Sequence, residues 1–318
     1  MITQILQFLK KTDGYFSGEE ISRRFRITRS AACKHIQELR HEGYEIIAVP
    51  HLGYRYVSAP DKLIPHEIQS HLGTNIFGRK IVCLDTLPST MDEAFRLGLD
   101  GAVEGTVVCA EGQLKGRGRL GRGWTSPKGK GIYFSVILKP LLPPNEVASL
   151  TLLSAVALSE AIKESSGISA LIKWPNDLLV NHKKLAGILI EMKGDLDRVR
   201  FVVIGIGLNV NTPLNLLPPQ ATSLKHELNK TFSRSEILKE ILRSLERWYE
   251  IFKKKGFEPI HRRWKEYSCT LGERVRIADG QGVVEGMAID IDDDGGLLIR
   301  RDTGLIVKRL TGDIVRII

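Results

Sequence analysis

The chain has 318 residues, of which 42% are hydrophobic and 26% are charged, and its formal net charge is +9. This composition is ordinary for a folded, soluble protein and excludes a largely disordered chain, while the length predicts two or three domains. The positive charge favours polyanionic partners such as DNA or nucleotides.

The four cysteines, at positions 33, 83, 109 and 269, form no CxxC pair that could bind zinc or act as a redox dithiol. We expect them to be reduced and structural, in a cytosolic protein. The first residues lack the basic region and apolar core of a signal peptide, and no stretch approaches 18 apolar residues. The sequence therefore predicts a protein that is neither secreted nor membrane-spanning.

Residues 1–62 have the pattern of a winged helix-turn-helix. Apolar residues recur at helical spacing from residue 2 to residue 9, and Ser17 and Glu20 form a capping-box pattern before a second helix. A short turn leads to a third helix over residues 29–41. Two short strands, predicted over residues 44–49 and 53–57, would form the wing.

The outer face of this third helix carries side chains that can reach base edges and phosphates in a major groove. A small folded domain for protein contacts is the alternative. A single winged unit reads only a short site, so a DNA-binding version is expected to act as a dimer on two half-sites. The candidate DNA-binding residues are Arg29, Ser30, Lys34, His35 and Gln37.

A proline-containing linker over residues 58–65 leads to a region in which strands and helices alternate. A strand is predicted over residues 81–84, and a helix follows Ser89, with Thr90 and Glu93 in capping-box register. The start of this helix is either a plain cap or a place where free N–H groups meet an anion.

Glycine and arginine alternate over residues 116–124, and no acidic residue occurs from Gly112 to Asn145. Glycine allows close backbone approach, and arginine presents a planar fork of donors to carboxylate or phosphate oxygens. A solvated basic loop or a nucleic-acid-binding tail is the alternative. Because predicted strands over residues 107–110 and 132–138 frame the segment, a loop that closes on an anion is favoured.

An apolar run over residues 171–180 is interrupted by Lys-Trp-Pro-Asn-Asp at 173–177. This insertion is either a turn alone or a nucleotide site, with lysine for phosphate, Asn and Asp for ribose, and a carboxylate for Mg²⁺. A strand with lysines at its start follows over residues 183–191. Another strand, over residues 201–210, ends in small residues, but its lone Gly-x-Gly lacks the rest of a dinucleotide fingerprint.

Long core helices are predicted over residues 145–165 and 235–255. From residue 269 only short strands appear, as in a small barrel. Asp290, Asp292 and Asp294 match the first half of an EF-hand loop, but Arg301 stands where a bidentate Glu is needed. This segment is therefore interpreted as a hairpin turn and not as a calcium site.

Taken together, the motifs resemble one family closely, the bifunctional biotin–protein ligases that also repress biotin operons. The resemblance covers nearly the whole chain and implies an α+β multidomain protein. Its parts would be an N-terminal winged helix-turn-helix (1–62), a central α/β catalytic domain with a mixed sheet (63–268) and a C-terminal SH3-like small β-barrel (269–318). The motifs that carry the resemblance are Ser89-Thr90, Gln113 with Gly116 to Arg122, Trp124, Lys173 to Asp177, Lys184 to Leu189, and Gly205 to Asn209.

The resemblance implies a biotin–[acetyl-CoA-carboxylase] ligase that works in two steps. Biotin carboxylate attacks the α-phosphate of ATP to give biotinyl-5′-AMP and pyrophosphate, and a lysine of the biotin carboxyl carrier protein then takes the biotin. Two anions must meet, so the site needs cations, Mg²⁺ on the triphosphate, and exclusion of water.

The resemblance also assigns roles to residues. Lys184, Arg119, Arg122 and Asp177 would be catalytic, with Mg²⁺ carried by ATP near Asp177. Where the family commonly has asparagine, this chain has Met91, so a side-chain hydrogen bond to biotin is lost there. Biotin would contact Ser89, Thr90, Met91, Gln113, Arg117, Gly118, Arg119, Lys184, Gly187 and Gly205, and ATP or the adenylate would contact Arg119, Arg122, Trp124, Lys173, Asn176, Asp177 and Asn209.

The family further uses the adenylate as a corepressor that favours a homodimer on operator DNA. Three alternatives compete with this interpretation: a repressor whose ligase domain has become a biotin sensor, a ligase without operator function, and a lipoyl or octanoyl transferase. The arginine-rich loop and Lys-Trp-Pro-Asn-Asp favour biotin over the transferase.

Overall fold

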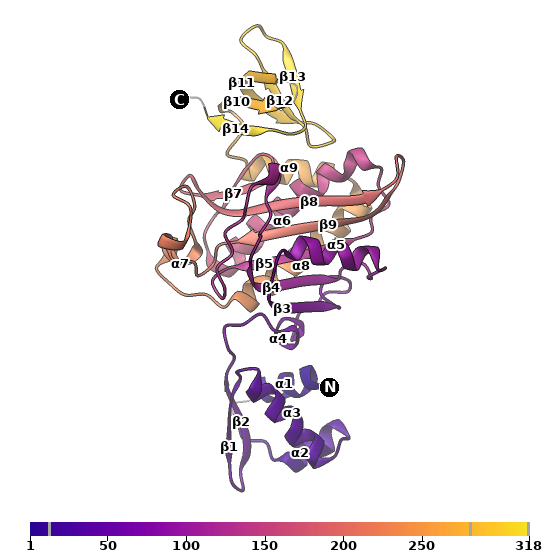
Figure 1. Ribbon diagram of the computed structural model, residues 1–318, viewed down its shortest axis with the longest axis vertical. Coiled ribbons are helices and arrows are strands. Elements are labelled where there is room, and N and C mark those ends of the chain that lie inside the picture. Colours follow the sequence, from indigo (N-terminus) through magenta and orange to yellow (C-terminus); the bar gives the residue numbers. More distant parts are fainter. Residues whose placement is uncertain (12–13, 280–281, 317–318) are drawn as a thin grey trace. The chain divides into compact units, whose positions relative to one another are not determined.

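The structure is a computed structural model that describes residues 1–11, 14–279 and 282–316. Its internal contacts divide the chain into two compact units, Met1–Gly73 and Thr74–Ile318 (Figure 1). The predicted domain bounds at 62/63 and 268/269 remain predictions.

The first unit is a three-helix domain with a β-hairpin and a fourth short helix. Ser17 and Thr28 cap α2 and α3 by accepting bonds from the backbone N–H groups of Glu20 and Ala31, each at 3.1 Å. Ile5, Leu9 and Ile36 lie in the core where the three helices meet. The elements are α1 (Ile2–Lys10), α2 (Gly18–Phe25), α3 (Arg29–His41), β1 (Glu45–Val49), β2 (Gly53–Ser58) and α4 (Pro65–Gln69).

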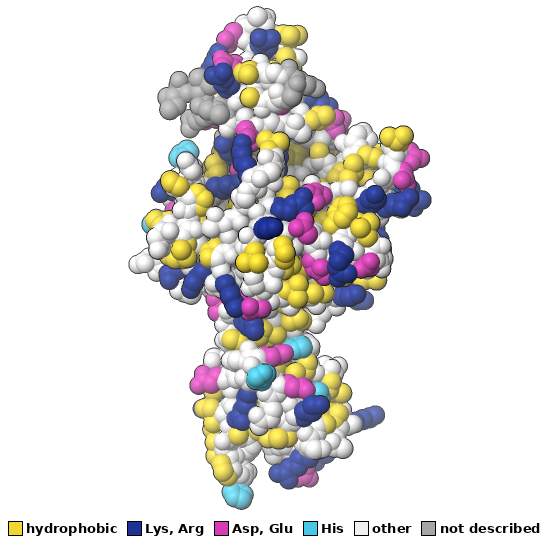
Figure 2. Space-filling model, in the orientation of Figure 1, with side chains coloured by type: hydrophobic (Ala, Val, Ile, Leu, Met, Phe, Trp, Pro, Cys, Tyr) yellow, Lys and Arg dark blue, Asp and Glu magenta, His cyan; other side chains and the backbone are white. Residues whose placement is uncertain are grey.

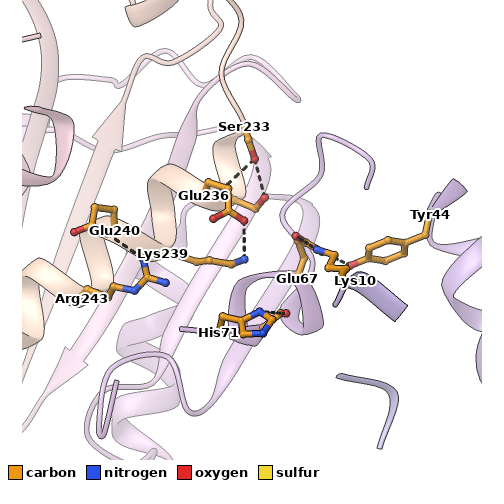
Figure 3. Close-up of polar contacts among 11 residues, drawn as sticks. Lys10, Tyr44, Glu67, His71, Ser233, Glu236, Lys239, Glu240 and Arg243 are labelled. Atoms are coloured by element: carbon orange, nitrogen blue, oxygen red, sulfur yellow. Dashed lines mark hydrogen bonds and ion pairs between the residues drawn. The ribbon is translucent and has the colours of Figure 1, made fainter. Parts of the chain in front are cut away.

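A buried cluster of charged and polar side chains binds α4 to the other elements of this unit. The carboxylate of Glu67, which is 2% exposed, accepts bonds from Lys10 Nζ at 2.6 and 2.7 Å and from the Tyr44 hydroxyl at 3.0 Å (Figure 3). Burial, and then the Glu67 charge, raise the pKa of Tyr44, so the tyrosine keeps its proton and donates it. A hydrophilic residue two positions beyond the predicted linker is thus a core residue of the domain.

The second unit is built on a seven-stranded mixed sheet with the strand order β3-β4-β5-β9-β8-β7-β6. Only β3 and β4 run parallel, and the other described pairs are antiparallel. This confirms the predicted α/β domain with a mixed sheet. The strands are β3 (Ile81–Leu87), β4 (Val107–Gln113), β5 (Ile132–Leu138), β6 (Leu171–Lys173), β7 (Asp177–Val180), β8 (Lys183–Gly194) and β9 (Val199–Leu208).

Helices cover both faces of this sheet (Figure 1). On one face lies α5 (Thr90–Leu99), which packs through Met91 and Ala94 on Val203 of β9. On the other lie α6 (Val147–Ser166), α8 (Arg234–Lys255) and α9 (Glu258–Tyr267). The short α7 (Leu224–Leu228) and α9 were not predicted from the sequence.

The C-terminal part is a five-stranded antiparallel sheet with the order β13-β12-β11-β10-β14. The acidic segment that resembles half an EF-hand is the turn between β11 and β12, as predicted, where Lys308 forms ion pairs with Asp292 and Asp294. The description of this domain as SH3-like remains a prediction. Its strands are β10 (Arg274–Asp279), β11 (Gly282–Ile291), β12 (Leu297–Arg300), β13 (Ile306–Arg309) and β14 (Asp313–Arg316).

Two local predictions were wrong. Cys83 and Cys109, expected to be reduced, form a disulfide, because the parallel register of β3 and β4 places them opposite each other with Cα atoms 4.7 Å apart. The cap of α5 is Ser89, which accepts a bond from Met91 N at 3.2 Å, and not Thr90. The segment Pro144–Ser166 is long and apolar enough to cross a membrane by length and composition alone, and 72% of its most apolar window is buried, as in the core helix that was predicted there.

Candidate active site

The start of α5 supplies one polar wall of a cavity. Gln113, the last residue of β4, accepts a bond from Thr90 N at 2.8 Å, and its amide donates to Ser126 Oγ at 2.9 Å. Ser135 Oγ lies 2.9 Å from Thr90 Oγ1. These bonds link the hydroxyl and amide groups of two strands, a loop and a helix.

Three glycines on β8 and β9 make the sheet side of the cavity. A Cβ atom at Gly205 would overlap the thioether of Met91, and one at Gly207 would overlap the indole of Trp124. At Gly187 it would lie 3.0 Å from the same indole. The glycines therefore let Met91 and Trp124 pack flat on the sheet and leave room beside them.

The glycine–arginine segment is a tight turn over this wall. Backbone bonds join Gly118 N to Arg122 O at 2.7 Å and Trp124 N to Gly116 O at 2.8 Å. Arg117 forms ion pairs with Asp92 of α5, at 2.5 Å, and with Glu191 of β8. Partial burial lowers the pKa of Arg117, but the two carboxylates more than offset this, so its pKa is raised and the group stays charged.

Arg119 and Arg122 are bound by the C-terminal domain. Arg122 forms an ion pair with Asp313, and the guanidinium of Arg119 donates to Gly312 O at 3.4 and 3.5 Å and to Asn176 Oδ1 at 3.1 Å. Burial lowers the pKa of Arg119 from its ordinary, very high value. The C-terminal domain thus forms part of the cavity, which the sequence did not indicate.

The Lys-Trp-Pro-Asn-Asp segment is the turn of the β6–β7 hairpin, with Asp177 beginning β7. Lys184, on the neighbouring strand β8, places its Nζ 2.6 Å from Asp177 Oδ1 and 5.4 Å from the centre of the Trp124 ring. Trp174 points away, donating through Nε1 to Gly295 O at 3.0 Å. The segment is therefore both a turn and a source of cavity residues.

The fold brings nearly all predicted site residues to one cavity, and Figure 2 shows basic and acidic side chains lying together over the middle of the large sheet. Lys173 is not among the residues that line it. The predicted residues that do line it are Ser89, Thr90, Met91, Gln113, Arg117, Gly118, Arg119, Arg122, Trp124, Asn176, Asp177, Lys184, Gly187 and Gly205.

A second cavity adjoins the first across Trp124 and Lys184, and Asn209 lines it together with the 217–221 loop. Two buried polar atoms lie on its lining residues, Trp124 Nε1 and Asn209 Oδ1. Neither has a hydrogen-bond partner within the described residues. Buried donors and acceptors are costly to leave unpaired, so these two atoms are candidates for ligand contacts.

Several lining residues were missed from the sequence. Asp313 lies 191 positions from Arg122, with which it pairs, and no local signal could have linked them. The loop residues Leu217, Pro218, Gln220 and Ala221 carry no motif. Gly207, in contrast, belongs to the Gly-x-Gly run of the sequence, so its place in the lining of the cavity could have been predicted.

The predicted DNA-binding side chains lie on α3. Arg29, Ser30, Lys34 and Gln37 are exposed, and His35 is half-buried beside Glu38, with Nδ1 2.9 Å from its carboxylate. The helix–turn–helix geometry and the hairpin are both as predicted.

Comparison with known proteins agrees with this architecture. Residues 84–209 match the biotin/lipoate A/B protein ligase family, residues 2–55 match an HTH domain, and residues 270–316 match the biotin protein ligase C-terminal domain. The bifunctional ligase/repressor BirA of Bacillus subtilis is 42% identical to the chain, and the match covers 92% of this chain and 91% of BirA. The chain belongs to the family of bifunctional biotin ligase/repressors.

Two further members show how widely the similarity extends. The Escherichia coli bifunctional ligase/repressor BirA is 29% identical over 91% of this chain and 89% of its own length. The biotin protein ligase from Aquifex aeolicus, solved in complex with biotin and ATP, is 32% identical with a TM-score of 0.64, covering 75% of this chain and 98% of that one. The similarity to the E. coli bifunctional protein therefore extends over both units of the chain, whereas the Aquifex aeolicus ligase matches 75% of it.

Proposed function

We propose that the protein is an ATP-dependent biotin–[acetyl-CoA-carboxylase] ligase that forms biotinyl-5′-AMP, transfers biotin to a lysine of the biotin carboxyl carrier protein, and represses biotin operon genes when it holds the adenylate. One observation carries the ligase function. Four cations, Arg117, Arg119, Arg122 and Lys184, converge on one cavity, and each is paired with a group of the protein that a ligand anion can replace.

Biotin would occupy the part of the cavity between α5 and β9. Ser89, Thr90 and Gln113 offer hydroxyl and amide groups to a polar ring, while Met91 over Gly205 gives it an apolar floor. Gly118 and Gly187 would allow close approach, and Arg117 would leave its carboxylate partners as the loop closes. The biotin carboxylate would then meet Lys184 and Arg119.

The reacting anions would be neutralised by residues of three elements. Lys184 would bridge the biotin carboxylate and the α-phosphate, with Arg119 and Arg122 acting from the loop. Asp177 and Asn176 could contact ribose or phosphate-bound Mg²⁺. We propose that this ion is held mainly by the phosphates of ATP and not by a protein cage.

Adenine would enter the second cavity. It carries an amino donor and ring acceptors, which suit the unpaired Asn209 Oδ1 and Trp124 Nε1. Neither cavity includes Lys173 among its lining residues, so its proposed phosphate contact has no support from the geometry.

For the repressor function, the adenylate would act as corepressor by ordering the loop and favouring a homodimer on operator DNA. Exposed leucines in the loop and in two turns of the catalytic domain, Leu114, Leu120, Leu141 and Leu196, are suited to such an interface. Arg29, Ser30, Lys34, His35 and Gln37 would then contact the operator. We further propose that the protein works in the cytoplasm and does not act at a membrane.

The ligase proposal is tested by incubating the full chain with biotin, MgATP and a biotin-acceptor domain and measuring the mass of the acceptor. The wild type should add one biotin, and Lys184→Ala and Arg119→Ala should add far less. Biotin binding without acceptor modification or pyrophosphate release would leave only a biotin sensor.

The repressor proposal is tested by titrating a biotin-operon promoter fragment with and without the adenylate. Salt-dependent binding that strengthens with the adenylate is expected, and Lys34→Ala should weaken it by about 1 kcal/mol. Equal binding with and without adenylate would contradict the coupling.

A further inference from the structure

A buried ion pair joins β4 to the start of α8. Arg234, the first residue of α8, is 0% exposed, and its guanidinium donates to Glu111 Oε2 at 2.9 Å and to Gly131 O at 3.2 Å. Glu111 lies on β4, two residues before Gln113, and is itself buried. Neither Arg234 nor Glu111 is among the described residues that line the two cavities. Because either partner alone would be an uncompensated buried charge, the pair holds β4, α8 and the chain at Gly131 together.

One wall of the second cavity is held by this pair. Trp124 lines that cavity, and the segment over residues 126–131 joins Trp124 to β5. Within the segment, Gly129 N donates to Glu111 O at 2.9 Å, and Gly131 O accepts the bond from the guanidinium. Both members of the ion pair therefore hold the segment, the glutamate through its backbone and the arginine through its side chain.

The opposite wall of the second cavity, which carries Asn209, is tied to the same place. Lys130 O accepts a bond from Asn211 N at 2.7 Å. The side chain of Asn211 donates to Phe232 O at 2.8 Å and accepts from Phe232 N at 3.0 Å. Phe232 lies two residues before Arg234, so a closed network of hydrogen bonds joins both walls to the start of α8.

We propose that Arg234 is a positioning residue for the nucleotide: through this network it sets the spacing of the walls that carry Trp124 and Asn209, and so the fit of adenine between them. The inference rests on the proposed function, which places adenine in the second cavity. It adds a role for a residue that touches no substrate. Small displacements of a binding wall weaken binding because the contacts of the ligand depend on its geometry.

The biotin part of the substrate cavity has anchors of its own. Thr90 is bound by Gln113 at 2.8 Å and lies 2.9 Å from Ser135 Oγ, and neither contact involves Arg234. Gln113 does contact Ser126, but this is the end of the segment away from Gly131. Loss of the Arg234 side chain should therefore affect the nucleotide far more than biotin.

The test uses two variants of the full chain. Arg234→Lys keeps the positive charge beside Glu111 but replaces the fork of donors by one nitrogen. The double variant Glu111→Gln with Arg234→Met removes both charges, so no buried charge is left unpaired, and it still lacks the donor to Gly131 O. Leu242→Ala, at a fully buried position of α8, is the control, because it lowers stability by leaving a cavity and changes no bond of the network.

Calorimetry measures the dissociation constant of biotin and, in its presence, that of a non-hydrolysable ATP analogue, at a temperature where each protein is folded. Both network variants should bind the analogue about tenfold more weakly, equivalent to about 1.4 kcal/mol, with biotin affinity within about twofold of the wild type. Leu242→Ala should bind both ligands as the wild type does, although its unfolding midpoint is lower.

Three results would overturn the assignment of Arg234: unchanged analogue binding in both network variants, an equal loss of biotin affinity, or the same loss of analogue binding in Leu242→Ala, which would show an effect of stability alone. Pyrophosphate release by the wild type is measured separately. If the wild type binds the analogue but releases no pyrophosphate, the ligase function fails while the role of Arg234 is still decided by the binding data.

Discussion

Ion pairs have different roles in the two units of the chain. In the N-terminal unit, Glu67 is almost completely buried and its partners Lys10 and Tyr44 hold a helix in place. In the catalytic unit, Arg117, Arg122 and Lys184 pair with carboxylates while 39%, 67% and 34% of their side chains remain exposed. The buried cluster of Glu67 stabilises the fold, whereas the exposed ion pairs of the catalytic unit are accessible to a ligand that replaces one partner.

The difference follows from solvation. A buried carboxylate that loses its partners is left uncompensated in a poorly solvated place, so breaking the pair is costly. An exposed pair gains little because water competes for both ions. Partners that are held weakly can be replaced by substrate carboxylate and phosphate, so the exposed pairs of the loop are suited to binding and the buried cluster is not.

The largest effect is expected from removing a cation of the cavity. Lys184→Ala should slow adenylate formation by about a thousandfold, or about 4 kcal/mol, because the charge at the reacting carboxylate and phosphate is lost. Its unfolding midpoint should change little. The neighbouring exposed lysine is the control: Lys183→Ala should leave pyrophosphate release near the wild-type rate, and an equal loss in both variants would contradict a specific role for Lys184.

A stability effect is expected from the buried cluster. Glu67→Gln should lower the free energy of unfolding of the N-terminal unit by about 3 kcal/mol, because Lys10 loses its counter-charge. Urea unfolding followed by circular dichroism measures this. Glu45→Gln, at an exposed position of the same unit, should lower the free energy of unfolding far less. Similar losses in the two variants would show that the burial of Glu67 does not make its ion pair more important for stability.

These two clusters also show what the sequence could predict. The winged helix, the glycine–arginine loop and Lys184 were predictable because each has a local signal: helical spacing, an unusual composition, or a motif. Asp313 and the buried Glu67 were not, since their roles depend on contacts with distant residues. The Cys83–Cys109 pair likewise needed the register of two strands, which spacing along the chain does not give.

A smaller, pH-dependent effect is expected from Tyr44. Because its pKa is raised in the folded state, the stability it contributes is fully present below the unfolded pKa near 10 and is lost as pH rises further. Tyr44→Phe should therefore cost about 1.5 kcal/mol at neutral pH through the lost bond to Glu67, and should reduce the alkaline loss of stability. Identical slopes of stability against pH above 10 in both proteins would contradict this assignment.

The most direct test of the comparison is the affinity of the full chain for biotin when the partners of Arg117 are neutralised. If these carboxylates only hold the arginine until a ligand arrives, Asp92→Asn combined with Glu191→Gln should tighten biotin binding by up to about fivefold, or about 1 kcal/mol. The unfolding midpoint should stay close to that of the wild type. Weaker biotin binding together with a large loss of stability would show that the pairs of the loop are structural, like that of Glu67, and would contradict the account.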